Sequence, residues 1–134
     1  MYWWEQYLGL PWETDRDCFY WFMFWRQEHF ADGETVKVES PDRAKVQNAI
    51  RFLSLSHCAL HGWRLAEHPV EGDAALLSMS KHPHHIGMIV FVDGNMKILH
   101  AVEGGSVVVS SRQELLINGW KIRSILTHAS NPVL

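Results

Sequence analysis

The sequence predicts an α+β domain in which helices come first and an antiparallel sheet follows. Residues 18–30 are apolar or aromatic on nearly every side, a pattern typical of a buried helix. From Gly62 onward, short apolar runs alternate with turn residues, which is typical of strands joined by tight turns. At 134 residues, with no repeat, linker or low-complexity tract, residues 1–134 are expected to form a single domain.

The predicted central helix runs from about Cys18 to Phe30. Thr14, Asp15 and Asp17 precede it, and short polar side chains of this kind accept hydrogen bonds from the unpaired N–H groups at a helix start. One face at helical spacing consists of Phe19, Phe22, Met23, Arg26 and Phe30. Because the remaining surface is also largely aromatic, we expect protein to surround this helix on most sides.

Two further helices are predicted in the N-terminal half. Residues 3–8 carry apolar side chains at helical spacing, and Gly9 ends that segment as a short lead-in helix. Ser40 followed by Pro41 is a common helix start and predicts a helix to about Leu55.

The C-terminal half is predicted to be mostly strands. The expected strands are 62–65, 73–79, 86–92, 96–102, 106–109 and 120–127, with a short helix at 112–117. Asp93-Gly94-Asn95 predicts a hairpin turn, because glycine accepts the positive φ that such a turn requires.

Composition excludes several classes of partner. The net charge is −3 and the Lys and Arg residues are scattered, so we expect no nucleic-acid partner. The longest apolar run, residues 19–25, is far shorter than the roughly 20 residues that span a bilayer, so no membrane span is expected. The start at Met1 lacks a basic region and a long apolar stretch, which predicts cytoplasmic synthesis without a signal peptide.

Cys18 is the candidate nucleophile, and it stands at the first turn of the predicted central helix. The positive end of a helix dipole favours the thiolate over the thiol. The alternative is a small buried cysteine in a core helix. Cys18 and Cys58 are the only two cysteines; both are expected to be thiols, and a disulfide between them would consume the nucleophile.

Two of the nine histidines are placed to assist a thiol. His85 begins one predicted strand, and His100 lies near the end of the next. Because the turn at 93–95 pairs these strands, the two imidazoles are expected to be cross-strand neighbours. A nucleophilic cysteine needs one group that accepts its proton and a second that orients the first. His85 and His100 fit these two roles.

Four short stretches together resemble the signature of the NlpC family of papain-like cysteine peptidases. They are Asp17-Cys18, Gly72-Asp73-Ala74, His85-Ile86-Gly87-Met88-Ile89-Val90 and Ile98-Leu99-His100-Ala101, in the family's order. The beginning and end of the chain look most like the branch found in phage tail-assembly proteins. The resemblance implies a papain-like (NlpC-type) α+β fold, with N-terminal helices packed on a C-terminal antiparallel sheet.

The resemblance also implies residue roles. Cys18 is the nucleophile, His85 the base and His100 the residue that orients His85. The oxyanion hole is expected from the Cys18 backbone N–H and a side chain of the preceding loop, where this chain has Trp12 and many members have tyrosine. Asp17 matches the acid before the nucleophile, which caps the helix or meets a substrate amine. Tyr20 stands where the family usually has glycine.

The implied activity is that of a cysteine peptidase or amidase that hydrolyses peptidoglycan stem peptides, commonly at the γ-D-glutamyl-diamino acid bond. No cofactor is implied. Phage tail proteins are the implied partners, and a phage particle, lysis or a secretion system would deliver the chain to the cell wall. The alternatives are a catalytically idle binding module of a phage tail tip and a secreted antibacterial amidase toxin of the same chemistry.

The other histidines suggest a metal site only weakly. His57 and His61 are four residues apart around Cys58, and His82 and His84 could add ligands. No glutamate follows His57, as the helix of a zinc peptidase requires. These histidines are therefore interpreted as surface or helix-end residues, and no metal is expected.

Overall fold

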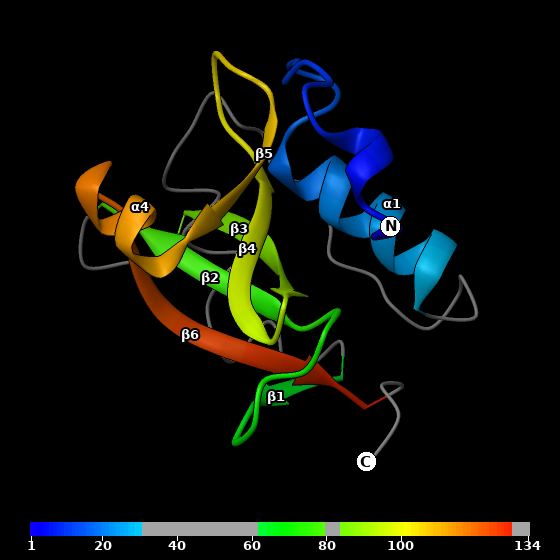
Figure 1. The fold of residues 1–134 in the computed structure, drawn as a ribbon, viewed down its shortest axis with the longest axis vertical. Helices are drawn as coiled ribbons and strands as arrows, with labels where there is room; N and C mark the ends of the chain where they lie inside the picture. Colours follow the sequence, from blue (N-terminus) through cyan, green and yellow to red (C-terminus); the bar gives the residue numbers. More distant parts are fainter. Residues whose placement is uncertain (31–61, 80–83, 130–134) are drawn as a thin grey trace.

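The computed structural model describes residues 1–30, 62–79 and 84–129 (Figure 1). The predicted helix from Pro41 to Leu55, and the residues His57, Cys58, His61 and His82, lie outside these ranges. No helix within the described ranges is long and apolar enough to cross a membrane.

A six-stranded sheet in the order β1-β6-β2-β3-β4-β5 dominates the described residues, and every neighbouring pair is antiparallel. The strands are β1 (Trp63–Leu65), β2 (Ala74–Ser78), β3 (His85–Val92), β4 (Asn95–Ala101), β5 (Val107–Ser111) and β6 (Lys121–His128). The helices are η1 (Glu5–Tyr7, a 3₁₀ turn), α1 (Cys18–His29) and α4 (Arg112–Ile117). In Figure 1, α1 and α4 lie on opposite sides of the sheet.

The predicted papain-like α+β fold with N-terminal helices is wrong. Among the described residues only α1, with 12 residues, is longer than the six-residue α4, so the fold is β-rich. The lead-in segment forms only the three-residue η1, because the chain after it is held in extended form along β5. The backbone N–H of Gly9 bonds to Val107 O, that of Val107 to Leu10 O and that of Trp12 to Gly105 O.

Most individual elements agree with their predicted positions. The helix predicted from Cys18 to Phe30 is observed at Cys18–His29, and the strands predicted at 86–92 and 96–102 are observed at His85–Val92 and Asn95–Ala101. Asp93 and Gly94 form the connecting turn with φ of 51° and 82°, the positive values that the glycine-containing turn predicted. The error therefore lies in how much helix the described residues contain, not in the hairpin.

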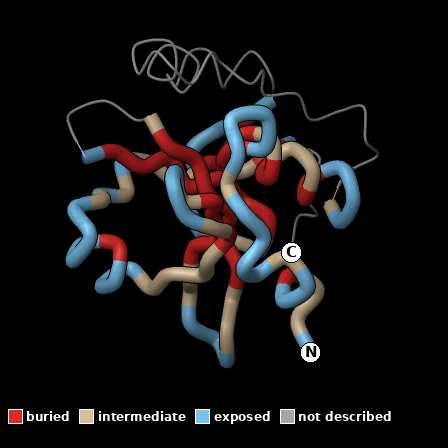
Figure 2. Tube along the Cα trace, turned by 90° about the horizontal axis from the view of Figure 1, so that it is seen from above, coloured by how far each residue is buried: buried red, intermediate tan, exposed pale blue. Residues whose placement is uncertain are grey.

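The face of the sheet that meets α1 carries the larger core. α1 packs on β3 and β4, and its Phe19, Phe22 and Trp25 are fully buried. The strand residues in this core are Trp63, Ala74, Leu76, Ile86, Met88, Val90, Leu99, Ala101, Val107 and Leu126. Figure 2 shows the buried residues gathered at the centre of the molecule. We call this side the α1 face.

The opposite side, which we call the α4 face, carries a smaller core. Its buried members are Ala75, Leu77, Ile89, Ile98 and Leu115, and half-buried Trp120 and Ile122 pack against them. The capping box between Ser111 and Glu114 fixes the start of α4, since each side chain accepts a hydrogen bond from the other residue's backbone N–H.

Buried Arg26 ties α1 to the start of β2. Its guanidinium donates to Gly72 O at 3.2 Å and lies over the rings of Phe30 and Trp63. Burial lowers the Arg26 pKa to about 10, against the opposing influence of Asp73, so the side chain stays charged. Gly72 has φ of 97°, and a Cβ there would lie 2.7 Å from the Phe30 ring. The Gly72-Asp73 motif therefore serves the packing of α1.

Candidate active site

Three side chains on the α4 face form a hydrogen-bonded chain. His85 Nε2 lies 2.9 Å from His100 Nδ1, and His100 Nε2 lies 3.0 Å from Ser110 Oγ. Both histidines are buried. The strands supply the geometry: β3 and β4 are joined by the short turn, β4 pairs with β5, and Ser110 lies diagonally across from His100 on the same face. The predicted contact between His85 and His100 is thus present.

Gly87 makes room for this pair. It follows His85 by two residues and so projects to the same face of β3. A Cβ at Gly87 would lie 2.5 Å from Ile98 Cγ2 and 3.1 Å from His100 Cβ. Any side chain there would push the neighbouring strand away from its present position. The glycine of the His-Ile-Gly stretch therefore has a local structural reason.

His100 is neutral at ordinary pH. Burial lowers its pKa from 6.5 to about 4, because the charged imidazolium loses its hydration. A neutral imidazole has one N–H and one lone pair. If Nε2 carries the proton and donates to Ser110, Nδ1 accepts from the Nε2–H of His85. This arrangement leaves Nδ1 of His85 with a lone pair and identifies it as the basic atom.

The indole of Trp120 stacks on His85. The two rings lie 4.7 Å apart at an interplanar angle of 30°, and Trp120 also contacts the ring of His84 at 5.2 Å. The backbone N–H of Met79 donates to His84 Nε2 at 3.1 Å. His85 is therefore held by a ring on one side and a hydrogen bond at Nε2.

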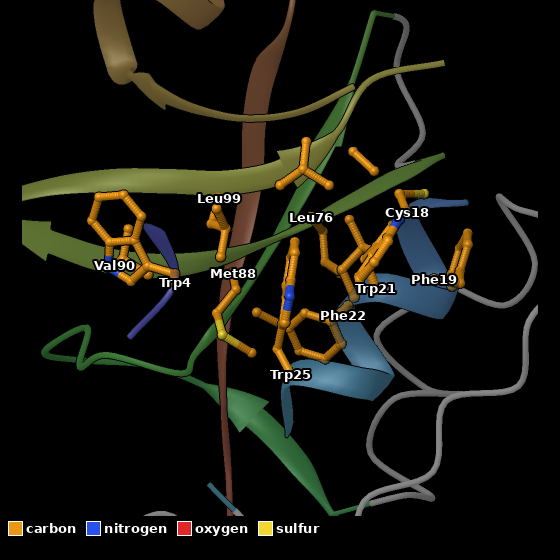
Figure 3. Close-up of a cluster of buried hydrophobic side chains, with 14 of the residues drawn as sticks. Trp4, Cys18, Phe19, Trp21, Phe22, Trp25, Leu76, Met88, Val90 and Leu99 are labelled. Carbon is orange, nitrogen blue, oxygen red and sulfur yellow. The ribbon is translucent and has the colours of Figure 1, made fainter. Parts of the chain in front are cut away.

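Cys18 is the first residue of α1, and its thiol is 1% exposed. It belongs to the core of the α1 face. Figure 3 shows it at one end of that core beside Phe19 and Trp21, with Val90 and Trp4 at the other end. Val90 lies near the last residue of β3, and Cys18 is at the opposite end of the core. Cys18 therefore lies near the end of the sheet where β3 starts at His85.

Cys18 and His85 belong to different faces but to the same end of the sheet. Side chains alternate along a strand, so His85 projects to the α4 face while Ile86 packs in the core of the α1 face. The segment before α1 bonds to residues 105–107, directly beside the end of β4. A reaction between the thiol and His85 therefore has to occur around this end of the sheet, where α1 and β3 both begin.

The two predicted substrate-binding residues lie before the helix. Asp17 is the N-cap of α1, and its carboxylate accepts a hydrogen bond from Tyr20 N at 2.9 Å. Capping was one of its two predicted roles. The Trp12 indole N–H is buried and has no hydrogen-bond partner among the described residues. Four other buried indoles share this property, so it does not by itself mark Trp12 as an oxyanion donor.

No group of three or more metal-ligating side chains occurs within residues 1–30, 62–79 and 84–129. His84, the one member of the suggested histidine set that is described, contacts Trp120 and Met79 instead.

One cavity lies along α1, and another borders the histidines through Trp120. The first, of about 260 Å³, runs along α1 from its start, and the described residues that line it are Asp15, Phe19, Tyr20, Met23, Phe24 and Gln27. The second, of about 290 Å³, lies between α4 and β6, and the described residues that line it are Arg112, Leu115, Leu116, Trp120, Lys121 and Ile122. Trp120 thus contacts His85 and also lines the second cavity.

Sequence reasoning missed Ser110 and Trp120. A signal existed for Ser110. It lies two residues after Val108 and so projects to the same face of β5, and Val108 pairs with His100. No local signal existed for Trp120. It reaches His85 only because β6 inserts between β1 and β2, a long-range pairing that no nearby residue indicates.

No protein-family model, curated protein or solved structure matches this chain.

Proposed function

We propose that this chain is a cysteine hydrolase that cleaves amide bonds, with Cys18 as the nucleophile and His85 as its base. The observation that carries the proposal is the buried chain from His85 through His100 to Ser110, at the end of the sheet where α1 begins. An imidazole whose second nitrogen is held by a neutral orienting group is the usual partner of a catalytic thiol.

The proton positions in this chain suit a base. His85 accepts the thiol proton at Nδ1 and becomes an imidazolium that still donates from Nε2 to His100. Since His100 stays neutral down to about pH 4, its Nδ1 remains an acceptor throughout. The face of the Trp120 ring favours a cation stacked on it, which supports the same charged form of His85.

The proposed reaction has two steps. Cys18 Sγ attacks the amide carbonyl carbon, the C–N bond breaks, and His85 gives its proton to the leaving amine. His85 then takes a proton from water, whose oxygen attacks the thioester and releases the carboxylic acid and the thiol. The Cys18 backbone N–H and the Trp12 indole are the proposed donors to the carbonyl oxygen.

The proposed substrate is a peptidoglycan stem peptide, at the bond between γ-D-glutamyl and a diamino acid. Support for this comes from the four stretches that resemble the NlpC-type cysteine peptidases, including the two that contain Cys18 and His85. The same resemblance supports an association with phage tail proteins. The resemblance concerns these motifs and not the overall fold, which is β-rich.

The proposal is tested by release of peptides from purified peptidoglycan, detected by mass spectrometry. Wild-type protein should release defined fragments, and Cys18→Ala should release none while keeping its far-UV circular dichroism spectrum. Equal release by the variant would refute Cys18 as the nucleophile.

One observation favours a second candidate, a catalytically idle binding module of a phage tail tip. Cys18 is 1% exposed in an apolar core, and His85 projects to the other face of the sheet. A thiol buried in apolar surroundings is unreactive. This candidate predicts no peptide release by wild-type protein and no loss of any binding property in Cys18→Ala.

A further inference from the structure

The cavity between α4 and β6 has an apolar floor and a cationic rim. Leu115, Trp120 and Ile122 supply apolar surface, while Arg112 and Lys121 are exposed at its edge. Leu116, also a lining residue, is 58% exposed, so the cavity opens to solvent. No acidic side chain occurs among the described lining residues.

The two cations have no partner among the side chains that the structure describes. Neither the Arg112 nor the Lys121 side chain forms a hydrogen bond or ion pair in the described part of the chain. Lys97 differs, because it lies close enough to Glu114 to lower the pKa of that carboxyl. The positive charge around the cavity is therefore available to an anion from outside.

The cavity lies directly behind the proposed base. Trp120 forms part of its wall and stacks on His85 at 4.7 Å between ring centres. In the proposed reaction His85 protonates the departing amine, so the leaving-group side of the substrate has to be next to His85. The part of the substrate that follows the cleaved bond therefore extends toward this cavity.

We propose that this cavity binds the leaving-group residue of the substrate, through a free carboxylate held by Arg112 and Lys121 and an aliphatic stem against Trp120 and Leu115. The occupant is thus a peptide whose residue after the cleaved amide carries an unblocked carboxylate. The inference rests on the proposed function for the position of the cleaved bond. Charge complementarity distinguishes this occupant from a neutral or cationic peptide.

Binding tests the inference without requiring catalysis. The probes are the tripeptide Ala-γ-Glu-Lys with a free C-terminal carboxylate and the same peptide with a C-terminal amide, each titrated into the Cys18→Ala variant. The free acid should bind about fivefold more tightly than the amide, the size of effect expected for an exposed charge pair. It should shift the Trp120 indole N–H resonance, and the preference should shrink as salt is raised.

Single-charge variants locate the site. Arg112→Gln and Lys121→Gln should each remove most of the preference for the acid, and both replace exposed side chains, so the fold should persist. Arg64→Gln is the matched control, because Arg64 is exposed on β1 and pairs with Thr127 near the other end of β6. The protein with Arg64→Gln should prefer the acid over the amide as strongly as the Cys18→Ala protein with Arg64 intact.

The outcomes separate the inference from the proposed function. Equal affinity for acid and amide, no binding of either, or the same loss in Arg64→Gln as in Arg112→Gln would overturn the cavity assignment. If the acid is preferred as expected but wild-type protein never cleaves any amide, the binding site stands and the hydrolase proposal fails. Cleavage of acid and amide with the same KM would support the hydrolase and reject the site.

Discussion

The two faces of the sheet differ in what their buried residues contribute. The α1 face is filled by large aromatic side chains, and indoles such as those of Trp21 and Trp25 have no hydrogen-bond partner within residues 1–30, 62–79 and 84–129. The α4 face has a smaller apolar cluster and adds a polar chain of two histidines and a serine. Burying polar groups costs free energy unless they are paired. The α1 face therefore mainly stabilises the fold, whereas the α4 face also holds groups whose chemistry suits proton transfer.

The largest expected effect comes from removing the base. His85→Ala should lower the rate of amide hydrolysis by about a thousandfold, because a positioned proton acceptor contributes roughly 10²- to 10⁴-fold. Steady-state kinetics on a soluble peptide measures this. Val109→Ala, on the α1 face of β5, is the control and should keep most of the activity. Full activity in His85→Ala would show that the α4 face takes no part in the chemistry.

A truncation in the aromatic core should instead act on stability. Trp25 is fully buried against Trp21 and Tyr7, so Trp25→Ala should lower the free energy of unfolding by about 4 kcal/mol. Urea unfolding followed by circular dichroism measures the change. Leu116→Ala, at an exposed position of α4, should cost less than about 0.5 kcal/mol. If Trp25→Ala and Leu116→Ala lose similar amounts of free energy of unfolding, the aromatic core of the α1 face is not the main source of stability.

The buried His100 should make stability depend on pH. Its pKa is about 4 in the folded state and 6.5 as the ordinary value, so the unfolded chain binds this proton more readily. The contribution of neutral His100 to the free energy of unfolding is fully present above pH 6.5. It is lost progressively as the pH falls through about 4, and the total loss is about 3 kcal/mol. Unfolding by urea at several pH values should show this loss.

The matched variant for that experiment is His100→Asn. Asparagine keeps polar atoms on the α4 face but does not titrate in this range. Between pH 6.5 and 4 the variant should therefore lose less free energy of unfolding than the wild type, and the difference is the contribution of His100. If wild type and His100→Asn lose the same free energy over this interval, His100 is not the buried neutral group described above.

The smallest expected effect concerns Trp120 as a positioning residue. Trp120→Leu removes the ring stacked on His85, and a stacked cation is worth about 0.5–1 kcal/mol. The rate should fall about threefold, and the bell-shaped pH profile should narrow because the imidazolium is less stabilised. Trp120→Phe keeps a ring and should restore most of the width. A lower rate with an unchanged profile in both variants would indicate a purely structural role.

Much of this architecture was predictable where local patterns control the structure. The start of α1 followed from the polar residues before Cys18, and the contact between His85 and His100 followed from the hairpin turn at Asp93 and Gly94. Each depends on neighbours within about fifteen residues, which periodicity and turn residues can indicate.

The errors have the opposite origin. Residues 3–8 have helical spacing, but hydrogen bonds from residues 9–12 to the start of β5 hold the following chain extended, so only the short η1 forms. Trp120 meets His85 through the insertion of β6 between β1 and β2. Both depend on contacts between segments some 35 to 100 residues apart, for which a single sequence has no local signal. The resemblance in four motifs implied a fold that the structure contradicts, and the site roles that it implied stay predictions.

The central claim is that His85 activates the Cys18 thiol across the end of the sheet. Its most direct test is the pH dependence of Cys18 alkylation by iodoacetamide, measured by mass spectrometry in a Cys58→Ser background so that one thiol remains. We expect rapid labelling of Cys18 well below about pH 8 in the protein that keeps His85, and labelling like that of an ordinary thiol in His85→Ala. Labelling that begins only above about pH 8, or an identical profile in the two proteins, would contradict it.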